Sequence, residues 1–203
     1  MKKNKISKNW INRQRRDIYV RKSKVDGYRS RAVYKLEEIN QKFNIFYNGA
    51  SILDLGAAPG SWSQYISKNY KNIKLASIDL NKFDQIENTF QIVGDFTENI
   101  YKQKILNFFK GKIDIVISDM AVNTTGNKNL DSIQTSELCL DAMRFSKEVL
   151  KKNGIFVSKI FIGSTFNEII NESKKIFKKN KVFKPSASRK ESKESFIVCT
   201  MLR

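Results

Sequence analysis

The sequence of 203 residues contains no histidine. This absence excludes Ser-His-Asp triads, metal sites built on imidazole and proton transfer by a histidine side chain. Any catalysis must therefore use lysine, aspartate, glutamate or tyrosine side chains, or depend on the chemistry of a cofactor.

Cysteine is also scarce. Cys139 and Cys199 lie far apart and outside any C-x-x-C pattern, so the sequence indicates neither a zinc site nor a disulfide framework. We expect no metal and a reduced intracellular compartment. The N-terminus lacks the apolar core of a signal peptide, and no segment reaches the roughly 18 apolar residues of a membrane span. The predicted location is the cytoplasm, without membrane contact.

Acidic residues are too few to balance the basic ones, since 20 Asp and Glu stand against 38 Lys and Arg and the formal net charge is +18. Residues 1–35 contain thirteen basic and two acidic residues, and residues 174–193 contain nine basic residues and Glu191. Such clusters favour a polyanionic partner. Much of the lysine also fits AT-biased codon usage, but the six arginines among residues 1–35 favour RNA.

The most informative stretch is residues 51–62, with the sequence SILDLGAAPGSW. An apolar run predicts a buried strand, and small residues then predict a tight loop at the start of a helix, where a flat ligand can lie against the backbone. Ala58 and Pro59 depart from the G-x-G-x-x-G dinucleotide fingerprint. An adenosine ligand without a phosphate chain fits better, with S-adenosylmethionine as the leading candidate. The alternative is an ordinary strand-to-helix turn.

Four predicted strands carry an aspartate at or near their C-terminal end. The strands are residues 52–55, 74–79, 90–95 and 113–119, and the aspartates are Asp54, Asp79, Asp95 and Asp119. Open α/β sheets bind ligands at this edge. Asp79 lies 23 residues after Gly56, which suits an acid that holds ribose hydroxyls. Asp95 is then placed for the adenine amino group.

The rest of the chain predicts a single α/β domain over residues 1–203, with residues 1–28 as a basic RNA-binding arm that contains Trp10. A solvated tail is the alternative for this arm. Helices are predicted from Ser30, as N-cap, to Phe43, from Ser63, and over residues 136–150 and 168–177. Further strands are predicted at residues 155–161 and 195–201. Residues 181–184 and a basic loop precede the second of these strands. Lys159 inside a buried strand needs a carboxylate partner or a cleft.

Six motifs lie in order along nearly the whole chain: residues 29–39 (RSRAVYKLEEI), 54–60 (DLGAAPG), 62–65 (WSQY), 118–121 (SDMA), 157–161 (VSKIF) and 192–196 (SKESF). Together they resemble the FtsJ/RrmJ family of S-adenosylmethionine-dependent RNA 2′-O-ribose methyltransferases. The resemblance implies a Rossmann-like class I methyltransferase fold, an α/β fold whose seven-stranded, mostly parallel sheet is flanked by helices.

The resemblance also implies the site residues. A catalytic tetrad maps to Lys35, Asp119, Lys159 and Glu194, and a cofactor site maps to Gly60, Trp62, Asp79, Asp95 and Asp119. Two positions depart from the family pattern, which commonly has glycine where Ser61 stands and proline where Val122 stands. We expect these departures to tune affinity or rate, because the charged residues are all present.

The implied reaction is methylation of a ribose 2′-oxygen, and the implied substrate is a uridine of large-subunit (23S) ribosomal RNA, in the A-loop of the peptidyl transferase centre on the assembled subunit. Alternatives are the anticodon loop of a transfer RNA, or a non-catalytic RNA-binding factor in ribosome assembly. A free lysine is almost fully protonated at pH 7. The sequence therefore leaves open whether Lys159 takes up the hydroxyl proton or only orients the hydroxyl. A monomer is expected.

Overall fold

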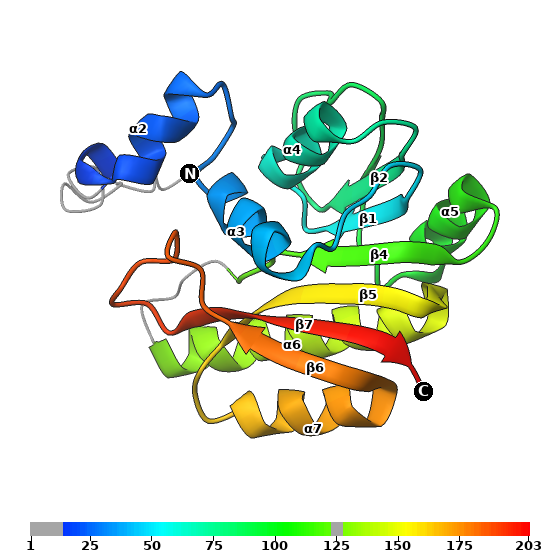
Figure 1. The fold of residues 1–203 in the computed structure, drawn as a ribbon. Helices are drawn as coiled ribbons and strands as arrows, with labels where there is room; N and C mark the ends of the chain where they lie inside the picture. Colours follow the sequence, from blue (N-terminus) through cyan, green and yellow to red (C-terminus); the bar gives the residue numbers. More distant parts are fainter. Residues whose placement is uncertain (1–13, 123–127) are drawn as a thin grey trace, which may run out of the picture.

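The computed structural model describes residues 14–122 and 128–203, and it is built around one seven-stranded sheet (Figure 1). The strand order is β3-β2-β1-β4-β5-β7-β6. The strands are β1 (Ser51–Leu55), β2 (Lys74–Asp79), β3 (Thr89–Val93), β4 (Ile113–Ser118), β5 (Leu150–Phe161), β6 (Phe177–Phe183) and β7 (Glu194–Leu202). Strand β7 runs antiparallel to both of its neighbours, β5 and β6, and the other strand pairs are parallel. The predicted seven-stranded, mostly parallel sheet is confirmed.

Helices cover both faces of this sheet (Figure 1). One face carries α3 (Val33–Phe43) and α4 (Ser61–Asn69), and the other carries α5 (Asn99–Phe109), α6 (Lys128–Val149) and α7 (Phe166–Ile176). The central strands are thus buried on both faces, which explains why β1 and β4 are mostly apolar, with Asp54 and Asp114 as the acidic exceptions, rather than alternating between apolar and polar residues.

Several elements extend beyond their predicted limits or were not predicted. Strand β5 begins at Leu150 rather than 155, so the helix predicted to reach residue 150 ends at Val149. In three others, little of the surface is apolar and buried. Helix α5 buries only Ile105 and Phe109. Helix α6 begins well before residue 136, where Leu130 and Ile133 are exposed and give no buried stripe. Strand β6 is an edge strand that begins at Phe177 rather than 181, with exposed lysines that obscure its pattern.

The expected cap of α3 was wrong. The N-cap is Ala32, without a side-chain hydrogen bond, whereas the Ser30 hydroxyl accepts from the Ala32 N–H and lies 2.8 Å from the hydroxyl of Ser61. Ser30 therefore stabilises the turn before the helix and joins it to the start of α4.

The predicted arm lies partly outside the described residues, since Trp10 and the rest of residues 1–13 are not among them. Its described part contains α2 (Ile18–Val25), which stands beside α3 in Figure 1. Tyr19 of α2 packs on Tyr34 of α3 with ring centroids 5.5 Å apart, and Tyr28 meets Tyr34 edge to face. This part of the arm is thus docked on the domain by aromatic contacts.

Among the helices of the described segments, none is long and apolar enough to cross a membrane. The same segments contain no group of three or more His, Cys, Asp or Glu side chains that could hold a metal ion.

Candidate active site

The four residues expected to be catalytic converge at the carboxyl edge of the sheet. Asp119 directly follows β4, Lys159 lies in the neighbouring strand β5, and Glu194 begins β7. The antiparallel register places Glu194 opposite Phe161 and Lys159 opposite Phe196. Lys35 lies in the first turn of α3, 159 residues before Glu194 in the chain. We call these four side chains the charged ring.

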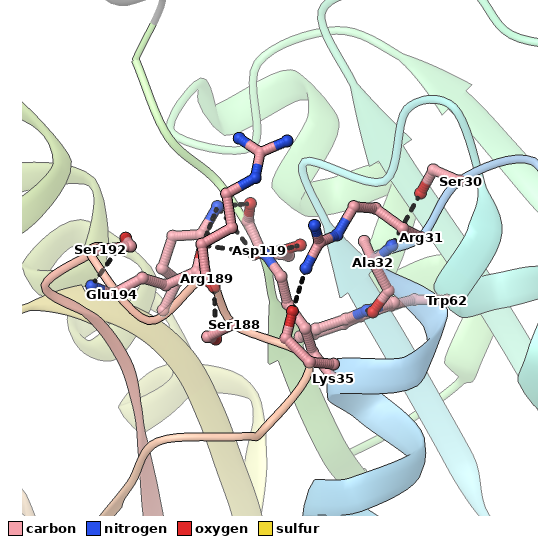
Figure 2. A network of polar contacts seen from close by, with 12 residues as sticks. Ser30, Arg31, Ala32, Lys35, Trp62, Asp119, Ser188, Arg189, Ser192 and Glu194 are labelled. Atoms are coloured by element: carbon pink, nitrogen blue, oxygen red, sulfur yellow. Dashed lines mark hydrogen bonds and ion pairs between the residues drawn. The ribbon is translucent and has the colours of Figure 1, made fainter. Parts of the chain in front are cut away.

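Charges of opposite sign alternate around this ring, of which Figure 2 shows Lys35, Asp119 and Glu194. The Nζ atom of Lys35 lies 2.8 Å from Glu194 Oε2 and 3.5 Å from Asp119 Oδ2. The Nζ atom of Lys159 lies 2.7 Å from Asp119 Oδ1 and 3.9 Å from Glu194 Oε2, and it donates a 2.7 Å hydrogen bond to the backbone oxygen of Asp119. The expected carboxylate partner of Lys159 is thus confirmed.

The ring is largely buried, with side-chain exposures between 8% and 17%. Burial alone would lower the pKa of Lys35, but the charges of Asp119 and Glu194 outweigh it and raise that pKa. Burial alone would raise the pKa of Asp119, but Lys159 and Lys35 outweigh it and lower that pKa. Lys35 therefore stays an ammonium and Asp119 a carboxylate at neutral pH.

A second group lies at the ends of β1, β2 and β3, and we call Gly60, Asp79 and Asp95 the ligand edge. Gly60 has a φ of +98°, and a Cβ there would come within 2.6 Å of Ile86 Cδ1 and 2.9 Å of Arg29 Nη1. Only glycine fits this position, so the loop before α4 exposes backbone rather than side chain.

The two aspartates of the ligand edge are oriented by local hydrogen bonds. Asp79 accepts from the Ala58 N–H through Oδ2 at 2.9 Å and from the Asn81 N–H through Oδ1 at 2.7 Å. Asp95 accepts from the N–H and the hydroxyl of Thr97 through Oδ1. Fixed carboxylates beside a bare backbone loop fit the hydroxyl and amino groups of an adenosyl ligand, so these residues suit S-adenosylmethionine.

Asp54 lies near the carboxyl end of its strand as expected, but unlike Asp79 and Asp95 its side chain is buried. It is 1% exposed, because it lies one residue before the end of β1 and faces α4, where its Oδ2 accepts from the Ser63 hydroxyl at 2.7 Å. Burial raises the pKa of Asp54 to about 7, although the hydrogen bond from Ser63 opposes the shift. Asp54 thus connects the end of β1 to the start of α4.

The side chain of Trp62 is also buried, at 3% exposure for the residue. Its Nε1 donates to the backbone oxygen of Ala32 at 2.8 Å, and its ring packs on Phe196 with centroids 5.8 Å apart. The indole therefore joins α4 to α3 and β7. A contact between Trp62 and a cofactor would have to use its backbone, in the first turn of α4, and it remains a prediction.

The two departures from the family pattern have different surroundings. Ser61 is 3% exposed and its hydroxyl lies against that of Ser30, so the added side chain joins α4 to the approach of α3. Val122 is half-buried at the end of the first described segment, and no contact in the structure explains the valine.

Sequence reasoning missed the side chains that hold the loop between β6 and β7. Glu38 of α3 accepts from the N–H groups of Ser186 and Ala187 at 2.5 and 2.8 Å. The Ser188 hydroxyl donates to Glu194 Oε1 at 2.6 Å. The loop thus connects α3 to the charged ring. Its basic composition was the only signal in the sequence.

Arg29 was also missed as a site residue, although it begins one of the recognised motifs. Its guanidinium donates to three backbone oxygens, those of Pro59, Asp84 and Gln85, at 2.7–3.0 Å. Arg29 thereby fastens the loop after β2 to the loop before α4, on both sides of the ligand edge.

A cavity of about 950 Å³ opens beside the charged ring. It lies between the start of α3, the start of α6 and the loops at 161–164 and 189–194. Its lining carries charges of both signs: Arg31, Lys35, Arg189 and Lys193 are basic, and Asp131, Glu191 and Glu194 are acidic. The charged ring is therefore open to a bulky substrate through this cavity.

Comparison with known proteins shows which family the chain resembles over its length. The model of the FtsJ-like methyltransferase family matches residues 28–202. A ribosomal RNA large subunit methyltransferase E from Pelagibacter ubique is 64% identical over 203 residues and covers all of both chains. The protein of the same name from Rickettsia bellii is 47% identical over 199 residues, covering 95% of this chain and 87% of its own.

Solved structures extend the comparison. A Plasmodium falciparum protein described as a ribosomal RNA methyltransferase has a TM-score of 0.77 and 34% identity, covering 86% of this chain and 98% of its own. Human methyltransferase-like protein 13 in complex with SAH, at 11% identity and a TM-score of 0.58 over 83% of this chain and 79% of its own, shows the same fold. The predicted Rossmann-like methyltransferase fold and S-adenosylmethionine as cofactor are confirmed, and the chain belongs to the FtsJ-like methyltransferase family.

Proposed function

We propose that the protein methylates the 2′-oxygen of a uridine in large-subunit ribosomal RNA, in the A-loop of the peptidyl transferase centre on the assembled subunit. The observation that carries the proposal is the charged ring beside the cavity, because binding RNA alone requires no buried carboxylates next to a polyanion. The names and full-length similarity of the Pelagibacter and Rickettsia relatives support the ribosomal substrate.

The cofactor, when bound, supplies a methyl group on a sulfonium that is already reactive toward an oxygen nucleophile. Gly60, Asp79, Asp95 and Asp119, together with the backbone of Trp62, would hold it. The protein must then align the ribose hydroxyl with that methyl group and let the hydroxyl proton leave as the bond forms.

In this proposal, Lys159 orients the hydroxyl. Its Nζ forms an ion pair with Asp119 Oδ1 and donates one hydrogen bond to the backbone oxygen of Asp119, which holds Nζ in place and leaves a further N–H for the ribose oxygen. Lys35 holds Glu194 in place, and the hydroxyl proton passes to solvent late in the reaction. Lys159→Arg, which keeps a donor but cannot act as a base, should retain a measurable rate, whereas a base role predicts complete loss.

Two basic side chains of the cavity, Arg189 and Lys193, and the described part of the arm, where Arg15, Arg16 and Arg21 are exposed, would bind the RNA backbone. A ribosomal substrate places the protein in the cytoplasm. We propose that it acts there as a monomer.

The test is transfer of labelled methyl groups from S-adenosylmethionine to purified large subunits, naked ribosomal RNA and bulk transfer RNA from a host that lacks the modification. Lys159→Ala is assayed in parallel, with the exposed Lys151→Ala as a control. We expect label on large subunits, at one 2′-O-methyluridine of the A-loop, and a loss of at least about 100-fold in Lys159→Ala only.

Other outcomes would change the assignment. Label on transfer RNA alone would move the substrate to the anticodon loop. Cofactor binding without methylation of any RNA would indicate a non-catalytic assembly factor.

A further inference from the structure

Asp17 is one of only two acidic residues among residues 1–35, and both oxygens of its carboxylate have partners. Through Oδ1 it accepts from the N–H groups of Tyr19 and Val20 and caps α2. Through Oδ2 it pairs with Nη1 of Arg31 and lies 3.5 Å from Nε of Arg189. Its side chain is 9% exposed. A buried acid between two arginines is not explained by capping, which needs only one oxygen.

The two arginines use their remaining donors differently. Arg31 donates from Nη2 to the backbone oxygen of Ala187 and is therefore occupied by the protein at both terminal nitrogens. Nη1 and Nη2 of Arg189 have no hydrogen-bond partner among residues 14–122 and 128–203. Figure 2 shows the Arg189 guanidinium turned away from Asp119 and Glu194, and Arg189 lines the cavity together with Lys193.

Arg189 is also tied in sequence to the charged ring, because the preceding residue, Ser188, donates to Glu194. The backbone at Arg189 is therefore held close to the point where the ribose must bind, and the ion pair with Asp17 orients its side chain. A guanidinium whose Nε faces a carboxylate, here in an ion pair at 3.5 Å, presents its two terminal nitrogens as a fork, which matches two oxygens of a phosphate.

We propose that Asp17 is a positioning residue that aims Arg189 at a backbone phosphate of the RNA strand whose ribose enters the cavity. The inference rests on the proposed function, since it takes an RNA phosphodiester as the ligand. Phosphate contacts set the register of a protein on a nucleic acid without reading sequence. The contact from Asp17 through Arg189 would thus set which ribose reaches Lys159.

The test compares Asp17→Asn with the wild-type chain. Asparagine caps helices as well as aspartate does, so this change keeps α2 and removes the charge that holds Arg189. We expect the KM for large subunits to rise about five- to tenfold, with kcat within about twofold and the affinity for S-adenosylmethionine unchanged. By charge alone, removing an acid from a basic arm would strengthen RNA binding and lower the KM. A rise in the KM therefore separates a positioning role from general electrostatics.

Asp26→Asn is the matched control, because it makes the same charge change in the same segment. Asp26 accepts from the Tyr34 hydroxyl at 2.7 Å and contacts neither arginine. Its KM should stay unchanged or fall. Arg189→Lys serves as the second variant, since it keeps the charge but lacks Nε and the fork, and it should raise the KM about as much as Asp17→Asn.

Combining Asp17→Asn with Arg189→Lys should add little to either change alone. An unchanged or lower KM in Asp17→Asn, or additive effects in the double variant, would overturn the proposal. Filter binding of each variant to large subunits and to transfer RNA reports affinity without turnover. If the wild type methylates no large subunits, the proposed function fails, while the affinity differences on whichever RNA binds still decide the role of Asp17.

Discussion

The ligand edge and the charged ring lie at the same edge of one sheet, but their side chains are held in different ways. At the ligand edge, Asp79 and Asp95 accept hydrogen bonds from residues at most 21 positions away in the chain. In the charged ring, each side chain is held by charges 35 or more residues away, and Lys35 and Glu194 are 159 residues apart. Local backbone thus orients the first group, whereas mutual charge in a buried site orients the second.

Asp119 belongs to the charged ring and is also a predicted cofactor contact, and its removal should have the largest effect. Asp119→Ala leaves two buried lysines with Glu194 as their only carboxylate in the ring. We expect a loss of about 3–5 kcal/mol in the free energy of unfolding, measured by urea titration, and a loss of methyl transfer beyond about 100-fold. Adding Lys35→Met restores neutrality and should recover part of the stability but none of the activity. Equal stability of the single and double variants would contradict a ring held by charge.

Asp54 is the exception at the strand ends, since its carboxyl group accepts a hydrogen bond from Ser63 and pairs with no cation of the described residues. Burial raises the pKa of Asp54 to about 7, so the folded protein keeps this proton to higher pH than the unfolded chain does. Its contribution to stability should therefore fall as the pH rises from about 4 to about 7.

Asp54→Asn should remove this pH dependence. The variant should match the wild type near pH 4 and exceed it by roughly 2–4 kcal/mol at pH 8 in urea unfolding. Asp141→Asn, on the surface of α6, serves as a control and should leave the wild-type curve unchanged. A variant less stable than the wild type at pH 8 would refute the assignment.

Asp79 tests the ligand edge alone. Asp79→Ala should weaken binding of S-adenosylmethionine about 10- to 100-fold by calorimetry, because a charged hydrogen-bond acceptor is lost. The charged ring does not involve Asp79, so kcat at saturating cofactor should change little. Asp84→Ala, an exposed residue in the following loop, is the matched control. A large fall in kcat would show that the two groups are not independent.

Ser61 should have the smallest effect. Ser61→Gly restores the family residue and removes the contact with Ser30, and we expect the KM for the cofactor to change by no more than about threefold. Ser30→Ala removes the same contact from the other side. If only Ser61→Gly changes the KM, the serine acts on the ligand directly rather than through α3.

By itself, the sequence was sufficient to predict the sheet, the ligand loop and which charged residues form the ring. Short apolar runs predict strands that are buried on both faces, and the small residues up to Gly60 predict the bare loop because they have little side-chain bulk. These features are local, so a linear pattern contains them. The resemblance of six motifs supplied Lys35 and Glu194, which no local pattern singles out.

Only the tertiary structure decided which charges meet and which are buried. It placed Asp54 below the ligand edge and the Trp62 indole in the core, since the faces of β1 and α4 depend on how α4 packs. It also joined Asp17 to Arg189 across 172 positions of chain. Such contacts depend on how distant segments pack, because folding alone brings these side chains within hydrogen-bond distance.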